Sequence, residues 1–273
     1  METLSWAPVQ QRHAIERVRF DIAFAEQIPQ RVIDAVQRKF EERREQLRFG
    51  PVQPAEFHQV SFQVGTPAPS VLQKAGGWKS VRNASTGTVE ALIVNQTGLA
   101  YESTDYRTWE MALRRFMSVA EFGVEQFAAV VDFRALALDY TDRFVFQGVP
   151  VEASPEEILD RALLASVSEG ARKGLYTWHV HRGWFDRLDG RTILMNQNVD
   201  AVDGKTHTGS DVRSIQIYTR AEFRPEPNQF VTSDLEAIFD QLHTLCNEHF
   251  SSIISESARS MVGMRSNGSG THA

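Results

Sequence analysis

The sequence predicts an α+β protein: two antiparallel or mixed β-sheet halves with flanking helices, and a long C-terminal helix packed across a sheet. Segments with apolar residues at every second position alternate with segments whose apolar residues recur every three or four positions. The stretch 104–146 joins such a helix almost directly to a buried, β-prone strand. The last long segment, from about Ser233 to about Met264, carries one continuous apolar stripe.

Size and composition fit a globular protein. The chain has 273 residues, of which 42% are hydrophobic and 10% aromatic, enough for a large core. Its net charge of -6 argues against a non-specific nucleic-acid binder, and the basic run 38–48 is interleaved with glutamates, as on a solvated helix face. We therefore expect no nucleic-acid partner.

Cysteine content and hydropathy predict a cytoplasmic protein. The single cysteine, Cys246, excludes an internal disulfide framework and fits a reducing compartment. No segment approaches the ~20 apolar residues of a membrane-spanning helix, and the N-terminal residues lack the long apolar run of a signal peptide. We expect no membrane partner.

Residues 1–150 are expected to form the N-terminal sheet-and-helix half. Residues 18–24 alternate as a half-buried strand, and a helix begins at Pro29 and runs to about Leu47. A helix with Trp109 and Phe116 on its apolar stripe then leads into the strand Ala128–Phe146. Between them we expect strands at 57–64, 78–83 and 89–101, a loop at 65–77 and a turn at 85–87.

Residues 151–264 are expected to form the C-terminal half. A helix capped by Ser154 extends to about Gly170, and the last helix follows from about Ser233. The tail 265–273 is Gly/Ser-rich and is expected to be disordered. Three strands are predicted in this half, at Leu175–Arg187, Thr192–Val202 and Asp211–Phe223, the first two joined by a hairpin turn at Leu188-Asp189-Gly190.

Two histidines are the sharpest candidates for metal ligands. In a strand, His179 and His181 point the same way, and neutral imidazole nitrogens suit zinc, iron or copper. Two ligands do not complete a site, and nothing fixes a third histidine, His207, beside them. We predict no metal and no cofactor, and keep a metal-dependent enzyme using His179 and His181 as the alternative.

No catalytic set assembles from the remaining residues. Cys246 lies in the apolar stripe of the last helix and is expected to be an inert core thiol, with a thiolate pair to His243 or His249 as the alternative. Asp139 and Asp142, beside Arg143, are expected to form an ion-paired strand end. The chain contains no G-x-S-x-G, G-x-x-x-x-G-K-[ST] or G-x-G-x-x-G motif. We predict that the protein is not an enzyme.

Aromatic and basic residues concentrate on the strand that opens the second half. Tryptophan, tyrosine and arginine favour binding because they offer a large rigid contact area with a polar handle. The alternative is that Tyr176, Trp178 and Trp184, which share parity, pack beneath the last helix; core and groove stay equally open. The candidate peptide-binding residues are Tyr176, Trp178, His179, His181, Arg182, Trp184 and Arg187.

Two blocks of the first half resemble the signature of a sporadically distributed, largely uncharacterised bacterial family of about this length. They are Tyr106-Arg107-Thr108-Trp109-Glu110 and Leu138-Asp139-Tyr140-Thr141-Asp142-Arg143-Phe144. In that family a Tyr-x-x-Trp-Glu helix leads to a Leu-Arg-Tyr-x-Asn/Asp-Arg strand, and a late helix carries a His and then a Phe, matched here by His243 and Phe250. This chain departs from the pattern at Asp139, where the family has arginine, which puts any role of that arginine in doubt.

The resemblance implies a function without catalysis. Members of what resembles this family include peptide-binding accessory proteins of ribosomal peptide natural-product biosynthesis, such as the crocagin pathway. By that resemblance we expect a protein that binds a precursor peptide and presents it to modifying enzymes of the same pathway, with a homodimer left open. A chaperone or antitoxin-like binding protein is a further alternative, because an open sheet edge or an aromatic groove serves each of these roles.

Overall fold

In the computed structural model, residues 5–61, 70–85, 87–173, 177–205, 209–226 and 232–264 are described, with the backbone alone for 56–61, 70–75 and 173. The strands are β1 (Ser5–Pro8), β2 (Ile15–Phe24), β3 (Gln53–Ser61), β4 (Ser70–Ala84), β5 (Gly87–Asn95), β6 (Gly98–Ser103), β7 (Phe133–Gln147), β8 (Trp178–Leu188), β9 (Arg191–Lys205) and β10 (Asp211–Phe223). The helices are α1 (Gln30–Arg43), α2 (Trp109–Ala128), α3 (Arg161–Leu164), α4 (Glu169–Lys173), α5 (Leu235–Ile253) and α6 (Glu256–Met261), with 3-10 turns η1 (Pro150–Glu152), η2 (Pro155–Glu157) and η3 (Thr232–Asp234).

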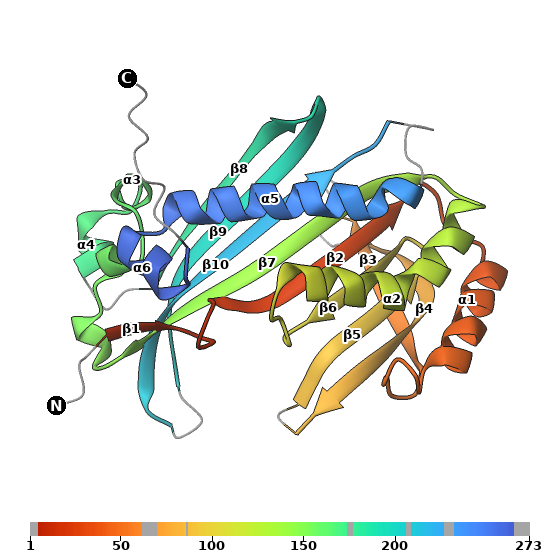
Figure 1. Ribbon diagram of the computed structural model, residues 1–273, viewed down its shortest axis with the longest axis horizontal. Helices are drawn as coiled ribbons and strands as arrows, with labels where there is room; N and C mark the ends of the chain where they lie inside the picture. The colour runs from red at the N-terminus through yellow and green to blue at the C-terminus, as the bar shows by residue number, and fades with distance from the viewer. Residues whose placement is uncertain are drawn as a thin grey trace. The chain divides into compact units, whose positions relative to one another are not determined.

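Among the described residues the strands form one ten-stranded sheet (Figure 1). Its order is β3-β4-β5-β6-β2-β7-β10-β9-β8, and β1 pairs with β7. The hairpins β3–β4, β4–β5, β5–β6 and β8–β9 are antiparallel. Helix α5 packs against the sheet through contacts such as that of Phe239 with Phe20. The predicted α+β class is confirmed, and its finer division into two sheet halves stays a prediction.

The described chain divides into two compact units, neither of which is contiguous in sequence. Unit 1 comprises the residues up to Val18, residues 139–221 and those from His243 onward, and unit 2 comprises residues 19–138 and 222–242. The sequence instead suggests contiguous halves that meet at residue 150, and that boundary stays a prediction. None of the described helices is long and apolar enough to cross a membrane.

Unit 2 is organised around the alternating strand that the sequence predicts. From Val18 onward every second residue of β2 is buried, so that Phe20 enters the core. The Phe20 ring stacks on Phe116 of α2 at a centroid distance of 4.4 Å and meets the edge of Phe239 at 5.2 Å. Helix and strand are therefore joined by aromatic contacts that add to the burial of apolar area.

Helix α2 begins at a side-chain cap. The Thr108 hydroxyl accepts a hydrogen bond from the Met111 backbone N–H at 3.3 Å. We expect Thr108→Ala to lower the free energy of unfolding by about 1 kcal/mol, because that N–H loses its partner. Urea denaturation measures the change. Thr108→Ser keeps the hydroxyl and should remain close to the wild type, and equal losses in both variants would contradict the capping role.

Two predicted boundaries in unit 2 are wrong, one at a glycine and the other at an asparagine turn. The expected loop at 65–77 is strand from Ser70 onward, because Gly77 serves close strand approach and not a turn: a Cβ there would lie 2.3 Å from the Val94 carbonyl oxygen. The expected strand 89–101 is two strands. Asn95 closes the turn between β5 and β6 by accepting hydrogen bonds from the backbone N–H and the hydroxyl of Thr97.

The ends of two helices also differ from the prediction. Helix α1 ends at Arg43 and not at Leu47, and its C-terminal turn closes at Arg48, which has φ 61°. The C-terminal end of α2 extends to Ala128, so that Val130, expected in a buried strand, is 45% exposed and β7 begins only at Phe133. Apolar character alone fits a helix or a strand at this boundary, and in the structure the helix extends over it.

Unit 1 contains the corrections with the clearest physical cause. The helix expected from Ser154 is replaced by two 3-10 turns, α3 and α4, and Ser154 makes no capping bond. The last helix likewise breaks between α5 and α6. Both interruptions meet at one place, where Leu159 and Ile254 form an isolated β-bridge that requires extended backbone in both segments. A tertiary contact therefore overrides helical periodicity.

The core of unit 1 includes a strand that the sequence analysis missed. In β1, Trp6 is 3% exposed, contacts the tilted Phe146 ring at a centroid distance of 5.4 Å and donates its indole N–H to the Ser154 carbonyl oxygen at 3.0 Å. The other members of this buried cluster come from β7, β9, β10, α3, α5 and α6 and from the segments next to them: Ala14, Phe144, Ile158, Leu159, Leu163, Leu164, Val199, Ala201, Ile215, Ile217, Phe250, Ile253, Ile254 and Ala258.

Candidate functional site

The predicted binding strand, β8, is the last strand of the sheet order on its side. Its side chains alternate: even-numbered residues are half-buried and odd-numbered residues are exposed. The seven candidate residues therefore do not form one surface. Trp178, Arg182 and Trp184 share one face, and the three odd-numbered candidates share the other; Tyr176 lies outside the described residues.

The even-numbered face of β8 packs toward the C-terminal part of α5. The Trp184 ring meets His249 edge-on at 4.9 Å, and the His249 imidazole bonds the Asp186 carboxylate at 2.8 Å. Hydrogen bonds from the Arg187 backbone and from His249 hold the pKa of Asp186 below its ordinary value. Trp178 also packs against the buried cluster of unit 1. Trp178 and Trp184 are thus half-buried, Trp178 against this cluster and Trp184 against α5.

The odd-numbered face of β8 is open to solvent. His179 bonds the Asp200 carboxylate at 2.6 Å and His181 bonds the Asn198 side chain, each partner lying directly opposite on β9. Arg187 is exposed, and beside it Phe185 is 72% exposed. This face combines imidazole, guanidinium and phenyl groups on one edge strand.

Each of the two histidines bonds a partner of its own. Their rings are nearly parallel, with an interplanar angle of 13° and centroids 6.4 Å apart. The Nδ1 atom of His179 bonds Asp200 and that of His181 bonds Asn198, so each ring already has a partner on β9. Within the described part of the chain, no three His, Cys, Asp or Glu side chains are grouped to hold a metal. His207 lies outside the described residues.

The cysteine prediction is confirmed. Cys246 is 1% exposed, and burial raises the pKa of its thiol well above the ordinary range. The neighbouring histidines are engaged elsewhere: His243 bonds the Tyr140 hydroxyl at 2.9 Å and His249 bonds Asp186. The structure therefore shows a core thiol and not a thiolate pair.

The expected ion-paired strand end is only partly correct. Asp139 is paired, with Arg220 of β10 at 2.8 Å, and Arg143 pairs with Glu16 of β2 at 2.9 Å. Asp142 is 3% exposed, lies on the opposite face of the strand from Arg143 and makes no ion pair with any described residue. Burial raises the pKa of Asp142 to about 8. Its carboxyl group lines a small apolar cavity of about 60 Å³ in unit 1, together with Thr219 and Cys246.

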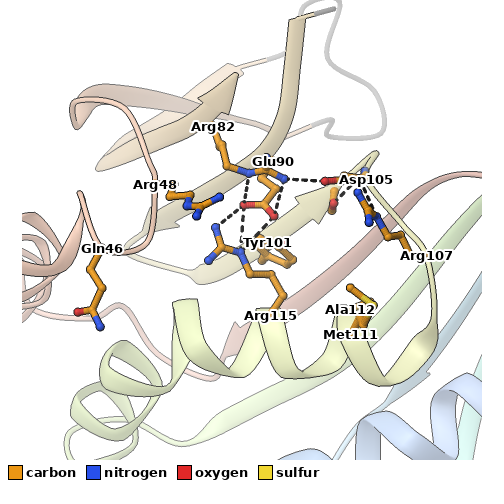
Figure 2. Close-up of a pocket in the computed structure, with 11 residues that line it drawn as sticks. Gln46, Arg48, Arg82, Glu90, Tyr101, Asp105, Arg107, Met111, Ala112 and Arg115 are labelled. Carbon is orange, nitrogen blue, oxygen red and sulfur yellow. Dashed lines mark hydrogen bonds and ion pairs between the residues drawn. The ribbon is translucent and has the colours of Figure 1, made fainter. Parts of the chain in front are cut away.

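A larger pocket, of about 370 Å³, lies within unit 2 and was missed by the sequence analysis (Figure 2). It is built from the C-terminal turn of α1, strands β4, β5 and β6, and the first turns of α2. Four arginines and two acids are the charged residues of its lining. The lining residues are Gln46, Arg48, Arg82, Glu90, Tyr101, Ser103, Asp105, Arg107, Met111, Ala112 and Arg115.

Glu90 is the centre of this pocket. It is 5% exposed and is held between two guanidinium groups: Arg115 Nη2 lies 2.6 Å and Arg82 Nε 3.0 Å from its carboxylate. Burial alone would raise the pKa of Glu90, but the hydrogen bonds from Arg115 and Arg82 hold it below its ordinary value. Figure 2 shows both arginines directed at the same carboxylate.

The remaining bonds make the cluster rigid. Arg115 also donates to the Leu47 carbonyl oxygen at 2.7 Å and lies over the Phe49 ring, and Arg82 donates to Asp105 at 3.0 Å. Burial, together with the Glu90 charge, raises the pKa of Tyr101 above its ordinary value, so its hydroxyl stays neutral. The pocket is therefore a preformed array of hydrogen-bond donors.

One signal for this pocket is present in the sequence. Glu90 shares its parity with Leu92 and Val94, which are both fully buried, so an acid occupies the core face of an otherwise apolar strand. A buried acid needs cationic partners. Which arginines supply them follows only from the fold, because Arg82 and Arg115 lie on β4 and α2.

The chain matches no known protein-family model and no curated protein. Function is therefore argued from these sites.

Proposed function

We propose that this protein binds an extended peptide along the outer edge of β8, and that it presents a precursor peptide to modifying enzymes without catalysing a reaction itself. The observation that carries this proposal is the position of β8: an 11-residue strand at the end of the sheet order, with Phe185 72% exposed. Long edge strands offer unpaired backbone groups, and natural proteins cover or blunt them.

The two faces of β8 suit such a role in different ways. Trp184 and His249 fix the inner face against α5, so the strand is held in place before a peptide arrives, which reduces the entropy lost on binding. On the outer face, Phe185 and Arg187 offer an apolar contact and a cation for alternate side chains of an added strand. Backbone pairing supplies affinity and these side chains supply selectivity.

The test is calorimetric titration with synthetic peptides that cover the short open reading frames beside the gene. One of them is expected to bind. A scan that methylates its backbone nitrogens one at a time should weaken binding at every second residue, because alternate N–H groups of an added strand point at β8. Failure of all the peptides, or a scan without this period of two, would overturn the proposal.

Replacing Phe185 by serine tests the location. We expect binding to weaken by about tenfold or more, since the peptide loses an aromatic contact that removes apolar surface from water. Val151→Ser is the matched control, because Val151 is 63% exposed in the same unit but lies outside β8. Sedimentation of both variants shows whether the edge instead pairs with a second copy of the chain: a wild-type dimer that Phe185→Ser dissociates would contradict peptide binding at this edge.

A further inference from the structure

The pocket around Glu90 carries more positive charge than its own acids neutralise. Its lining includes the guanidinium groups of four arginines and the carboxylates of Glu90 and Asp105, an excess of two positive charges. Arg82 and Arg115 are satisfied by these acids, and Arg107 lies 3.6 Å from Asp105. Arg48 makes no ion pair with any residue that the structure describes, although Figure 2 shows its guanidinium directed toward the Glu90 cluster.

The backbone of Arg48 supports a ligand-binding role. The Phe49 N–H bonds the Arg44 carbonyl oxygen and the Arg48 N–H bonds that of Glu45, which is the Schellman pattern at a helix C-terminus. Position 48 therefore requires the left-handed conformation, with φ 61°, which glycine adopts without strain. An arginine here costs stability, and its side chain points at an arginine-rich pocket. Strained non-glycine residues of this kind concentrate at binding sites.

One part of the pocket lining is apolar. Met111 is 51% exposed, and it lies with Ala112 on the first turns of α2, beside the donors of the arginine cluster. The volume of about 370 Å³ is within the range of small-molecule sites. A ligand that fits would carry a charged head for the arginines and an apolar body for Met111.

We propose that this pocket binds a small dianionic oxyanion, a phosphate monoester or a dicarboxylate, with an apolar group attached. Two negative charges on the ligand match the excess of two positive charges in the pocket. Arg48 supplies a guanidinium group for this ligand, because the acids of the pocket pair with the other arginines. The proposal is independent of peptide binding at β8, because every residue it uses lies in unit 2 and none lies on that strand.

Calorimetry at low ionic strength tests the ligand class. Phenyl phosphate and phenylsuccinate are the two dianion probes, inorganic phosphate lacks the apolar body, and benzoate is the monoanion. We expect at least one dianion probe to bind and to weaken as salt is added. Which one binds more tightly identifies the head group. No binding by either dianion, or equal affinity for benzoate, overturns the proposal.

Variants place the ligand in the pocket. Arg48→Gln should weaken binding by about tenfold or more, the effect of losing a charge-assisted hydrogen bond, whereas Arg38→Gln, an exposed arginine of α1 outside the pocket, should leave it within about twofold. Met111→Gln should remove the preference for phenyl phosphate over inorganic phosphate. Arg48→Gly should weaken binding equally while the melting temperature rises. Equal losses in the Arg48 and Arg38 variants, or unchanged binding after Arg48→Gly, overturn the site.

Discussion

Replacement of Glu90 by glutamine is expected to lower the free energy of unfolding by about 3 kcal/mol at pH 7. Glu90 is 5% exposed, and the side chains of Arg82 and Arg115, which are 23% and 27% exposed, lie within 3.0 Å of its carboxylate. Removing one partner of a buried ion pair leaves the other charges desolvated and uncompensated, which costs more than the pair itself contributes. Here two guanidinium groups lose the same acid.

The pH dependence of this effect follows from the direction of the shift. Because the pKa of Glu90 in the folded protein lies below its ordinary value of 4.5, the stabilisation is present above that pH and is lost as the pH falls through the lower, folded value. The Glu90→Gln variant lacks this dependence. Denaturant unfolding of both proteins at several pH values should show curves that converge below about pH 4.5.

Glu102→Gln is the matched control. Glu102 also pairs with an arginine, Arg19 at 3.3 Å, but both side chains are 30% exposed, so the loss should stay below about 1 kcal/mol. If the Glu90 and Glu102 variants lose equal stability, the arginine cluster does not act as a buried unit.

Asp142→Asn is expected to stabilise the protein, by on the order of 3 kcal/mol at pH 7. Asp142 is buried without an ion pair to any residue that the structure describes, and that burial raises its pKa from 3.8 to about 8. Each unit of such a shift corresponds to about 1.4 kcal/mol between the two protonation states. Asparagine has nearly the same shape and carries no charge to desolvate, so it avoids this cost.

The pH dependence of stability expected from Asp142 has the opposite sign to that expected from Glu90. A raised folded pKa means that stability is fully present below pH 3.8 and is lost as the pH rises through about 8. The advantage of Asp142→Asn should therefore be small near pH 4, grow to pH 8 and then stay constant. Asp211→Asn, at a 71% exposed side chain, is the control and should show no such trend. An advantage independent of pH would contradict the explanation.

The sequence predicted those elements whose pattern is determined locally. The strands around Phe20 and at Asp211–Phe223, the helix through Phe116, and the Asp189-Gly190 turn are all present, because alternation, helical spacing and turn residues are local properties. The wrong predictions lie where a contact with a residue distant in sequence determines the local structure. Leu159 is extended because it pairs with Ile254, and Gly77 is in a strand because β5 lies close to it.

The candidate sites follow the same division. That β8 is aromatic and basic could be read directly, but which of its faces is buried depends on α5, so Trp184 and His181 separate onto opposite faces. The pocket around Glu90 is lined by residues from five parts of the chain. In the sequence, only the acid on the core face of β5 indicates that such a pocket exists. Arg48 gives no sequence signal, because its left-handed backbone is the product of a helix end.

The tight turn at Asp189 and Gly190 decides which side chains lie on the outer face of β8. Both residues have positive φ, and the turn fixes the pairing of β8 with β9 from Leu188↔Arg191 onward. Side chains alternate between the two faces of the strand. Inserting or deleting one residue in this turn would therefore exchange the faces, so that Trp184 would replace Phe185 on the outer face. Which side chains lie on the outer face of β8 is thus a matter of parity, which a single-codon insertion or deletion can reverse while every other residue stays the same.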